Sequence, residues 1–200
     1  MMEIIKEEFK GDYIKITSKI RNVIIKAYSD YYNLVHMEPY LEKYKPKTEA
    51  EVQILLPARN FMNSIVRTIQ EEFILIVCSL ENKDDKANSI TQLKAKLHNY
   101  LVNFDSYKDG LLKMPPDDDN IKKVRNTAIA HINLNIDYEG IYTQKVKDRL
   151  NILKNCFNSY LFSDATEYII DDNLIEKIET ESRIGVQQLF YGFVNWICNR

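Results

Sequence analysis

The chain has 200 residues and a formal net charge of −2 at pH 7, with 45% hydrophobic and 28% charged residues. This is ordinary globular composition, sufficient for one domain with a substantial core. The near-neutral charge excludes a basic surface spread over the whole molecule, which simple electrostatic binding of nucleic acid would require. Five glycines and five prolines favour helices over a turn-rich all-β fold.

The cysteines and the apolar segments indicate a cellular compartment. Cys78, Cys156 and Cys198 are odd in number, far apart and in apolar surroundings, which favours buried thiols in a reducing compartment over disulfides or a zinc site. The longest apolar run, Phe73 to Cys78, is too short to span a bilayer, and residues 1–8 lack the apolar segment of a secretory signal. We expect a cytoplasmic protein without membrane contact.

The first predicted helix covers residues 12–36, where apolar side chains recur every three or four positions. Tyrosines widen this apolar stripe, and their helical spacing favours core packing over stacking on nucleic-acid bases. They are Tyr13, Tyr28, Tyr31 and Tyr32. Pro39 and Pro46 predict a break over residues 37–47. His36 would lie at the end of the helix and face its negative dipole end.

The second predicted helix begins at Thr48, which forms a capping-box pattern with Glu51. Pro57 predicts either a kink or a new helix starting at Ala58. An apolar stripe follows and makes this the most buried helix of the set. Its members are Phe61, Ile65, Ile69, Phe73, Ile76 and Leu80.

The remaining predicted helices are separated by polar turns. Asn88-Ser89 opens a third helix on which His98 lies among polar residues and is expected at the surface. A loop over 104–117 precedes a fourth helix over 121–133, and a fifth begins near Thr143. A last helix, about 171–199, is capped by residues 171–173, and its apolar stripe comprises Leu174, Ile178, Val186, Leu189, Phe193 and Trp196. The chain therefore reads as one all-α domain, residues 1–200, of about six helices.

The fourth predicted helix carries the residues best suited to chemistry. Two prolines and the acidic run Asp117-Asp118-Asp119 signal its start. At about 100° per residue, Arg125 and His131 flank the small Ala128 on the side expected to meet other protein. A cation and an imidazole on a packing stripe are costly unless something pairs with them.

This pattern, Arg125-Asn126 followed after four residues by His131, resembles the signature of the HEPN superfamily (higher eukaryotes and prokaryotes nucleotide-binding domain). More narrowly, the segment 88–93 (Asn-Ser-Ile-Thr-Gln-Leu) before the motif helix resembles the AbiU-type abortive-infection branch. The resemblance covers about residues 10–165. It implies a HEPN-like four-helix core with an extra C-terminal helix.

The chemistry of the motif suits a phosphodiester better than a carbonyl. Arginine supplies a permanent charge and a planar fork of donors for phosphate oxygens, and histidine transfers a proton near neutral pH. No serine or cysteine lies within one turn of His131, although Thr127 lies one turn away. RNA supplies the missing nucleophile through its own 2′-OH. The resemblance implies the same reaction, metal-independent cleavage that leaves a 2′,3′-cyclic phosphate and a 5′-OH.

We therefore expect an endoribonuclease that acts as a toxin or antiviral-defence effector. Arg125, Asn126 and His131 would be catalytic, and Lys122 and Lys123 would contact RNA phosphates. We expect no cofactor and no metal, because the acidic run reads as a helix cap. The expected partners are RNA, a second copy of the chain, and an antitoxin or regulatory protein. Resemblance to HEPN proteins with a nucleotidyltransferase antitoxin fails at Asn133, where they carry a modifiable tyrosine.

Two other readings stay open at this point. The chain could be a non-catalytic HEPN-like module that binds a nucleotide, RNA or a protein. It could also be a plain helical interaction domain in which Arg125 and His131 tie the bundle together.

Overall fold

The computed structural model describes residues 4–43, 48–84, 86–119, 121 and 140–198. The all-helical prediction is confirmed, since these residues form α-helices and short 3₁₀ turns and no strand. The α-helices are α1 (Lys10–Lys43), α2 (Glu49–Leu80), α3 (Ile90–Tyr100), α5 (Gly140–Ser159) and α6 (Asp172–Cys198). The 3₁₀ turns are η1 (Glu7–Phe9), η2 (Phe104–Ser106), η3 (Lys108–Gly110) and η4 (Ser163–Tyr168). Apart from Ile121, the predicted motif helix lies outside the described residues.

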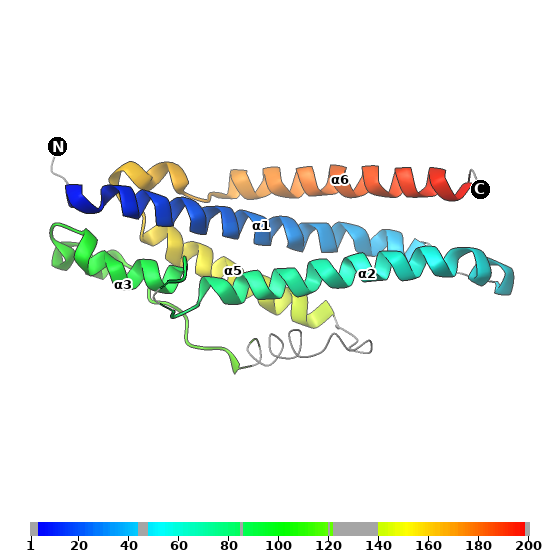
Figure 1. Ribbon diagram of the computed structural model, residues 1–200, viewed down its shortest axis with the longest axis horizontal. Helices are drawn as coiled ribbons and strands as arrows, with labels where there is room; N and C mark the ends of the chain where they lie inside the picture. The colour runs from blue at the N-terminus through cyan, green and yellow to red at the C-terminus, as the bar shows by residue number, and fades with distance from the viewer. Residues whose placement is uncertain (1–3, 44–47, 85, 120, 122–139, 199–200) are drawn as a thin grey trace.

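Helix α1 is the centre of the bundle. It packs against α2 on one side and α6 on the other, with α3 and α5 also in contact with it, as Figure 1 shows. The largest fully buried side chains of the main core come from α1, α2, α5 and the residue that follows α5: Tyr13, Tyr28, Phe73, Phe157 and Tyr160. None of the helices in the described part of the chain is long and apolar enough to cross a membrane.

Two of the predicted helix starts are confirmed by their hydrogen bonds. The Ser89 hydroxyl oxygen accepts from the Gln92 amide at 3.1 Å at the start of α3. One Asp171 carboxylate oxygen accepts from the Leu174 amide at 2.8 Å at the start of α6. Both side chains satisfy an amide that the first turn of a helix leaves without a partner.

The predicted break over residues 37–47 is wrong in its first part. Helix α1 continues through Pro39 to Lys43. Met37 is buried on one side of the proline, and the Tyr40 ring stacks on Phe190 of α6, with ring centroids 4.3 Å apart, on the other. This packing offsets the backbone hydrogen bond that proline removes. Likewise, α2 runs through position 57 as one helix, so no new helix starts at Ala58.

The prediction for His36 is also wrong, because the helix does not end there. Its ring stacks on Tyr32 within α1, with the ring centroids 6.4 Å apart. Nε2 is buried and has no hydrogen-bond partner among the described residues. His98, in contrast, is exposed as predicted.

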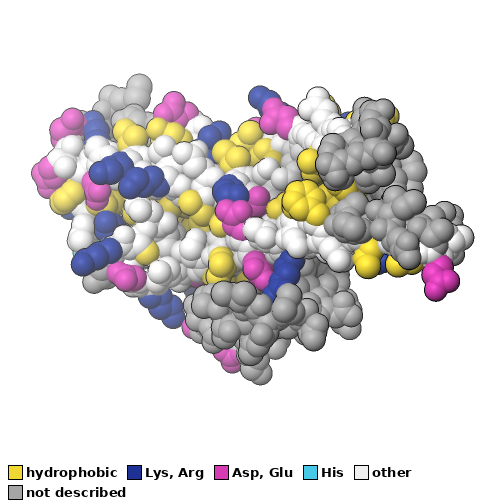
Figure 2. Space-filling view, turned by 45° about the vertical axis from the view of Figure 1, so that its right-hand side comes forward, with side chains coloured by type: hydrophobic (Ala, Val, Ile, Leu, Met, Phe, Trp, Pro, Cys, Tyr) yellow, Lys and Arg dark blue, Asp and Glu magenta, His cyan; other side chains and the backbone are white. Residues whose placement is uncertain are grey.

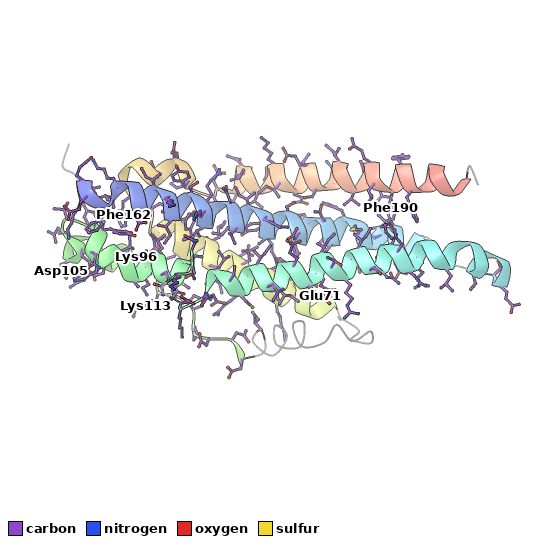
Figure 3. The ribbon with its side chains drawn as sticks, in the orientation of Figure 1. Glu71, Lys96, Asp105, Lys113, Phe162 and Phe190 are labelled. Carbon is purple, nitrogen blue, oxygen red and sulfur yellow. The ribbon has the colours of Figure 1, made fainter. Side chains whose placement is uncertain are left out.

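A second, smaller core lies where α1, α2 and α6 extend together beyond the rest of the bundle. It contains Met37, Met62, Val186 and Phe190, and Figure 3 shows Phe190 on the side of α6 that faces α1. The predicted stripes are therefore wrong by one residue at two places. Phe61 is 59% exposed and Met62 is buried, and Leu189 is 45% exposed while its neighbour Phe190 is buried.

The thiol predictions hold in part. Cys156 is buried and its thiol lies 3.4 Å from the Lys113 carbonyl oxygen. Cys78 is only half-buried. The side chain of Cys198 lies outside the described residues.

Lys147 of α5 is buried against the tyrosine cluster of α1. Its ammonium lies 3.8 Å from the ring centroid of Tyr28, 5.0 Å from that of Tyr31 and 5.2 Å from that of Tyr32. Burial lowers the pKa of Lys147 to about 8, and the neighbouring Lys154 contributes to this shift. The three rings attract the ammonium and offset part of its desolvation cost.

Release of the Lys147 proton from the folded protein should therefore make stability rise with pH between about 7 and 9. In that range the unfolded chain still binds the proton that folded Lys147 has released, so folding becomes more favourable, by about 1 kcal/mol between pH 7 and 9. Above pH 10 the trend should reverse. Burial raises the pKa of Tyr32 to about 12, so the unfolded chain loses its tyrosine protons first.

Urea denaturation of the wild type and of Lys147→Met at pH 7 and pH 9 tests this expectation. Lys147→Met should lose the rise in stability. Lys145→Met, at an exposed position two residues away on α5, should keep it. A wild-type stability that falls steadily from pH 7 to 9 would contradict the assignment.

Candidate functional site

The residues predicted to carry the chemistry, Arg125, Asn126 and His131, lie outside the described residues, as do Lys122 and Lys123. The structure describes both flanks of this segment. Residues 111–119 and Ile121 lead into it, and α5 follows it from Gly140. The described part of the site therefore consists of these two flanks.

The loop before the motif is fixed at its end by a local cap. The Ile121 amide donates to a carboxylate oxygen of Asp118 at 3.2 Å, and the Ile121 side chain is 6% exposed. Asp118 thus acts as the helix-start residue that the acidic run predicts. Asp117 lies 3.4 Å from the ammonium of Lys83, in the turn after α2. Burial of the Ile121 side chain beside Cys78 places the start of the motif segment against the C-terminal end of α2, and the exposed Asp117–Lys83 pair adds little.

Arg149 of α5 ties the same loop to the bundle from the inside. Its side chain is 8% exposed, and its guanidinium forms a bidentate ion pair with Glu81 at the end of α2, in which Nε lies 3.1 Å and 3.2 Å from the two carboxylate oxygens. A second guanidinium nitrogen donates to the Pro116 carbonyl oxygen at 2.7 Å. Nε and Nη2 donate to Glu81 and Nη2 also donates to Pro116, so one planar guanidinium joins α2, α5 and the loop.

Breaking this pair should destabilise the fold strongly. Arg149→Ala should lower the free energy of unfolding by about 3–5 kcal/mol. It leaves the partly buried Glu81 carboxylate without its cation and removes the hydrogen bond that Arg149 donates to the Pro116 carbonyl. Chemical denaturation followed by circular dichroism measures the loss.

The matched control is the exposed pair Lys177–Glu181 on α6, whose atoms lie 3.9 Å apart. Glu181→Gln should change stability by no more than about 0.5 kcal/mol. Equal effects of the two substitutions would contradict the structural role of Arg149.

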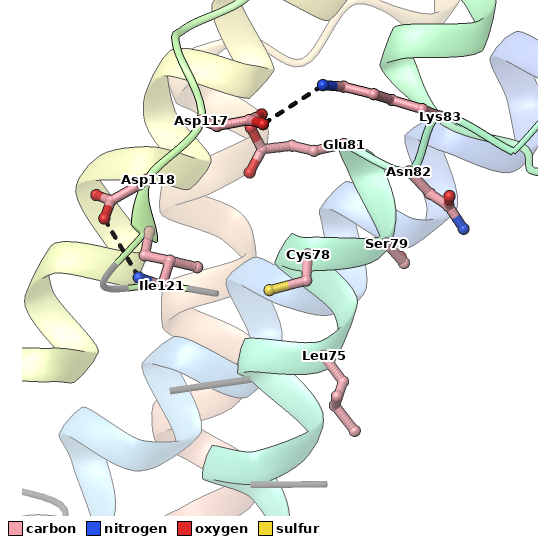
Figure 4. A pocket seen from close by; sticks show the side chains of 9 residues that line it. All are labelled: Leu75, Cys78, Ser79, Glu81, Asn82, Lys83, Asp117, Asp118 and Ile121. Atoms are coloured by element: carbon pink, nitrogen blue, oxygen red, sulfur yellow. Dashed lines mark hydrogen bonds and ion pairs between the residues drawn. The ribbon is translucent and has the colours of Figure 1, made fainter. Parts of the chain in front are cut away.

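A pocket of about 390 Å³ opens between the end of α2 and this loop (Figure 4). Its described lining is Leu75, Cys78, Ser79, Glu81, Asn82, Lys83, Asp117, Asp118 and Ile121. Figure 4 shows the thiol of Cys78 and the side chain of Ile121 facing one another across it. The one ammonium of this described lining, Lys83, is already paired with Asp117, and Glu81 is paired with Arg149, so the described lining offers a phosphate no free cation and we expect no phosphodiester to bind there.

The segment after the motif is held by amide and hydroxyl contacts. The Gln70 amide nitrogen of α2 donates to the Thr143 hydroxyl at 3.1 Å, and the Tyr31 hydroxyl of α1 donates to the Gln144 side-chain oxygen at 3.0 Å. A second pocket, of about 260 Å³, lies between these residues. The two described flanks of the motif segment thus both lie beside α2, with Ile121 near Cys78 and Thr143 near Gln70.

The surface around these elements is mixed in charge. In the face that Figure 2 shows, basic and acidic side chains lie interspersed, with hydrophobic side chains among them. Among the described residues, no group of three or more histidine, cysteine, aspartate or glutamate side chains is arranged to hold a metal ion.

Comparison with known proteins adds no relative. No protein-family model, curated protein or solved structure matches this chain. The site must therefore be interpreted from its own residues.

Proposed function

We propose that this chain is a metal-independent endoribonuclease of the HEPN type, acting as a toxin or antiviral-defence effector. The observation that carries the proposal is the sequence Arg125-Asn126 followed after four residues by His131. Both described flanks of the motif lie beside α2: Ile121 shares a pocket with Cys78 near the C-terminal end of that helix, and Thr143 of α5 accepts a hydrogen bond from Gln70. A catalytic segment needs such a rigid frame to hold reacting groups in position.

The reaction uses a nucleophile that the RNA itself provides. The 2′-hydroxyl oxygen attacks the adjacent phosphorus while a histidine accepts its proton. The bond from phosphorus to the 5′-oxygen breaks, and that oxygen receives a proton from a protonated histidine. The products are a 2′,3′-cyclic phosphate and a 5′-OH.

Each motif residue has a distinct role in this scheme. His131 moves the proton, which is worth on the order of 10²–10⁴-fold in rate. Arg125 stabilises the negative charge that builds on the phosphorane, with an effect of comparable or larger size. Asn126 orients the phosphate or the imidazole, and Lys122 and Lys123 contact neighbouring phosphates.

Two copies of the chain would form the active unit. On one helix, Arg125 and His131 would be about 120° apart and roughly 9 Å apart along the axis, so they converge poorly on one phosphate. A two-fold pair of motif helices would surround one scissile bond with two arginines and two histidines. An antitoxin or regulatory protein would keep this site inactive. Because the residue two positions after His131 is Asn133, it would do so without modifying a tyrosine there.

Cleavage should need no divalent metal. The carboxylates described beside the motif already contact other groups of the protein. Asp118 caps Ile121, Asp117 lies near the Lys83 ammonium, and Glu81 pairs with Arg149. Purified protein incubated with total RNA should cleave it equally well with and without EDTA. Activity that vanishes in EDTA and returns with Mg²⁺ would contradict the proposal and make Asp117 to Asp119 candidate ligands.

A further inference from the structure

The smaller pocket, between α1, α2 and the start of α5, has a lining that suits one kind of ligand. Its volume is about 260 Å³, just below the range of about 300–1,000 Å³ that is typical of small-molecule sites. The two long helices supply the apolar side chains Leu34, Val35 and Val66. Figure 1 shows the start of α5 beside the middle of α2, and this start supplies Thr143 and Gln144. The pocket therefore suits one heterocyclic ring system between aliphatic walls.

Gln70 of α2 is the buried polar residue of this pocket, with 8% of its surface exposed. Its amide nitrogen donates one hydrogen to the Thr143 hydroxyl at 3.1 Å. Its side-chain oxygen accepts no hydrogen bond from the residues that the structure describes. A buried amide oxygen without a partner is unfavourable. A ligand that donates to this oxygen, and accepts the second amide hydrogen, therefore gains two hydrogen bonds there.

The other polar groups of the pocket are mostly acceptors. The Tyr31 hydroxyl gives its hydrogen to the Gln144 side-chain oxygen at 3.0 Å, so the tyrosine oxygen can only accept. The Gln144 amide nitrogen already donates to Asp148 at 2.9 Å. Glu38, exposed on α1, adds a carboxylate. The described lining contains no cation, which disfavours a phosphate and favours a neutral ligand with an amino group.

Adenine has the matching pattern of groups. Its amino group donates and the neighbouring ring nitrogen accepts, which is the pair of hydrogen bonds that a glutamine amide forms with this base. Uracil and guanine carry a carbonyl oxygen where adenine has its amino group, and that oxygen would face the oxygen of Gln70. Cytosine has the same pair of groups as adenine on a smaller ring. In single-stranded RNA these edges are open to protein side chains, and apolar side chains stack on the faces of the base.

We propose that this pocket binds an adenine base, held by the side-chain amide of Gln70, and thereby selects the RNA sequence next to the motif. The two described flanks of the motif segment lie beside Cys78 and Gln70. These residues are about 12 Å apart along α2, a distance that a strand of a few nucleotides covers. The selection of RNA rests on the proposed function, whereas the adenine site itself does not.

Binding of trinucleotides that cannot be cleaved tests the site without any assay of activity. The probes are four 2′-deoxy trinucleotides that carry only adenine, only cytosine, only guanine or only uracil, because the proposed reaction needs a 2′-OH. Dissociation constants come from titrations of the full chain followed by NMR. The adenine trinucleotide should bind about fivefold or more tightly than those of guanine and uracil, the lower limit for a bidentate contact to a base. The cytosine trinucleotide should lie between them.

Two substitutions with matched controls assign the binding to the pocket. Gln70→Met removes the amide and should bind adenine no better than uracil, whereas Gln188→Met, exposed on α6, should keep the preference. Val35→Trp, at a lining position that is 40% exposed, should fill the pocket and weaken adenine binding by about tenfold or more. Val52→Trp, at a position of α2 that is 37% exposed and not part of the described lining, is its control.

Three results would overturn the inference: no binding by the wild type, equal binding of the four trinucleotides, or an adenine preference that survives Val35→Trp. Circular dichroism checks the fold of each variant, and Val35→Trp decides the question alone if Gln70→Met does not fold. The two proposals fail separately. Adenine binding with this pattern by a protein that leaves RNA intact would refute only the ribonuclease. Cleavage that shows no base preference and is unchanged by Val35→Trp would refute only the adenine site.

Discussion

Replacing His131 by alanine should reduce RNA cleavage by on the order of 10²–10⁴-fold, since it removes the group that transfers the proton. Arg125→Ala should cause a loss of similar or larger size, because the charge on the phosphorane is then unopposed. Any growth arrest on expression should disappear with the activity. Both variants should keep the helical circular-dichroism signal.

The chain offers matched controls for both substitutions. His98 is exposed on α3 and Arg183 is exposed on α6, so His98→Ala and Arg183→Ala should cleave like the wild type. If His131→Ala and Arg125→Ala also cleave like the wild type, the ribonuclease assignment is wrong. If both unfold, the two residues hold the bundle together, which is the plain structural reading of the motif.

Mixing the two inactive variants should recover part of the activity. If subunits exchange freely, roughly half of the dimers in an equimolar mixture contain one chain of each kind. Such a dimer keeps one intact His131 and one intact Arg125 on different chains, within the same shared cleft. Cleavage rates measured before and after co-refolding the two chains give the recovery.

Three outcomes would count against a shared site. The activity could fail to recover although the mixed dimer forms, or the wild type could cleave at full rate as a monomer. In the third, one of the two variant chains alone would account for all the activity of the mixture. The mixed dimer is detected by a tag on one of the two chains.

Local chemistry predicted the helix starts well. Ser89 and Asp171 cap helices through an amide three residues away, so a short stretch of sequence contains the whole interaction. The acidic run before the motif is of the same kind, and Asp118 caps Ile121 as expected. Tyr13 and Tyr28 are core residues, as their spacing predicted.

The errors come from tertiary packing, which a local pattern does not contain. Pro39 stays inside α1 because Met37 and Tyr40 pack on either side of it. The stripes of α2 and α6 shift by one residue, to Met62 and Phe190, because the partner helices and not periodicity alone decide which residue faces inward.

Long-range polar contacts were missed entirely. Arg149 meets Glu81, 68 residues away in sequence, and Lys147 meets tyrosines of α1. The available signal was weak: both residues are cations placed among the apolar residues of α5. A cation at such a position needs a compensating partner, but the position of that partner cannot be predicted from the sequence around it.

The chemical ends of the cleaved RNA test the central claim most directly. Purified wild-type protein should be incubated with a defined single-stranded RNA in EDTA, and the fragments analysed by mass spectrometry. The account predicts a 2′,3′-cyclic phosphate on the upstream fragment and a 5′-OH on the downstream one, with neither formed by His131→Ala. Fragments that end in a 3′-OH and a 5′-phosphate, or RNA that stays intact, would contradict it.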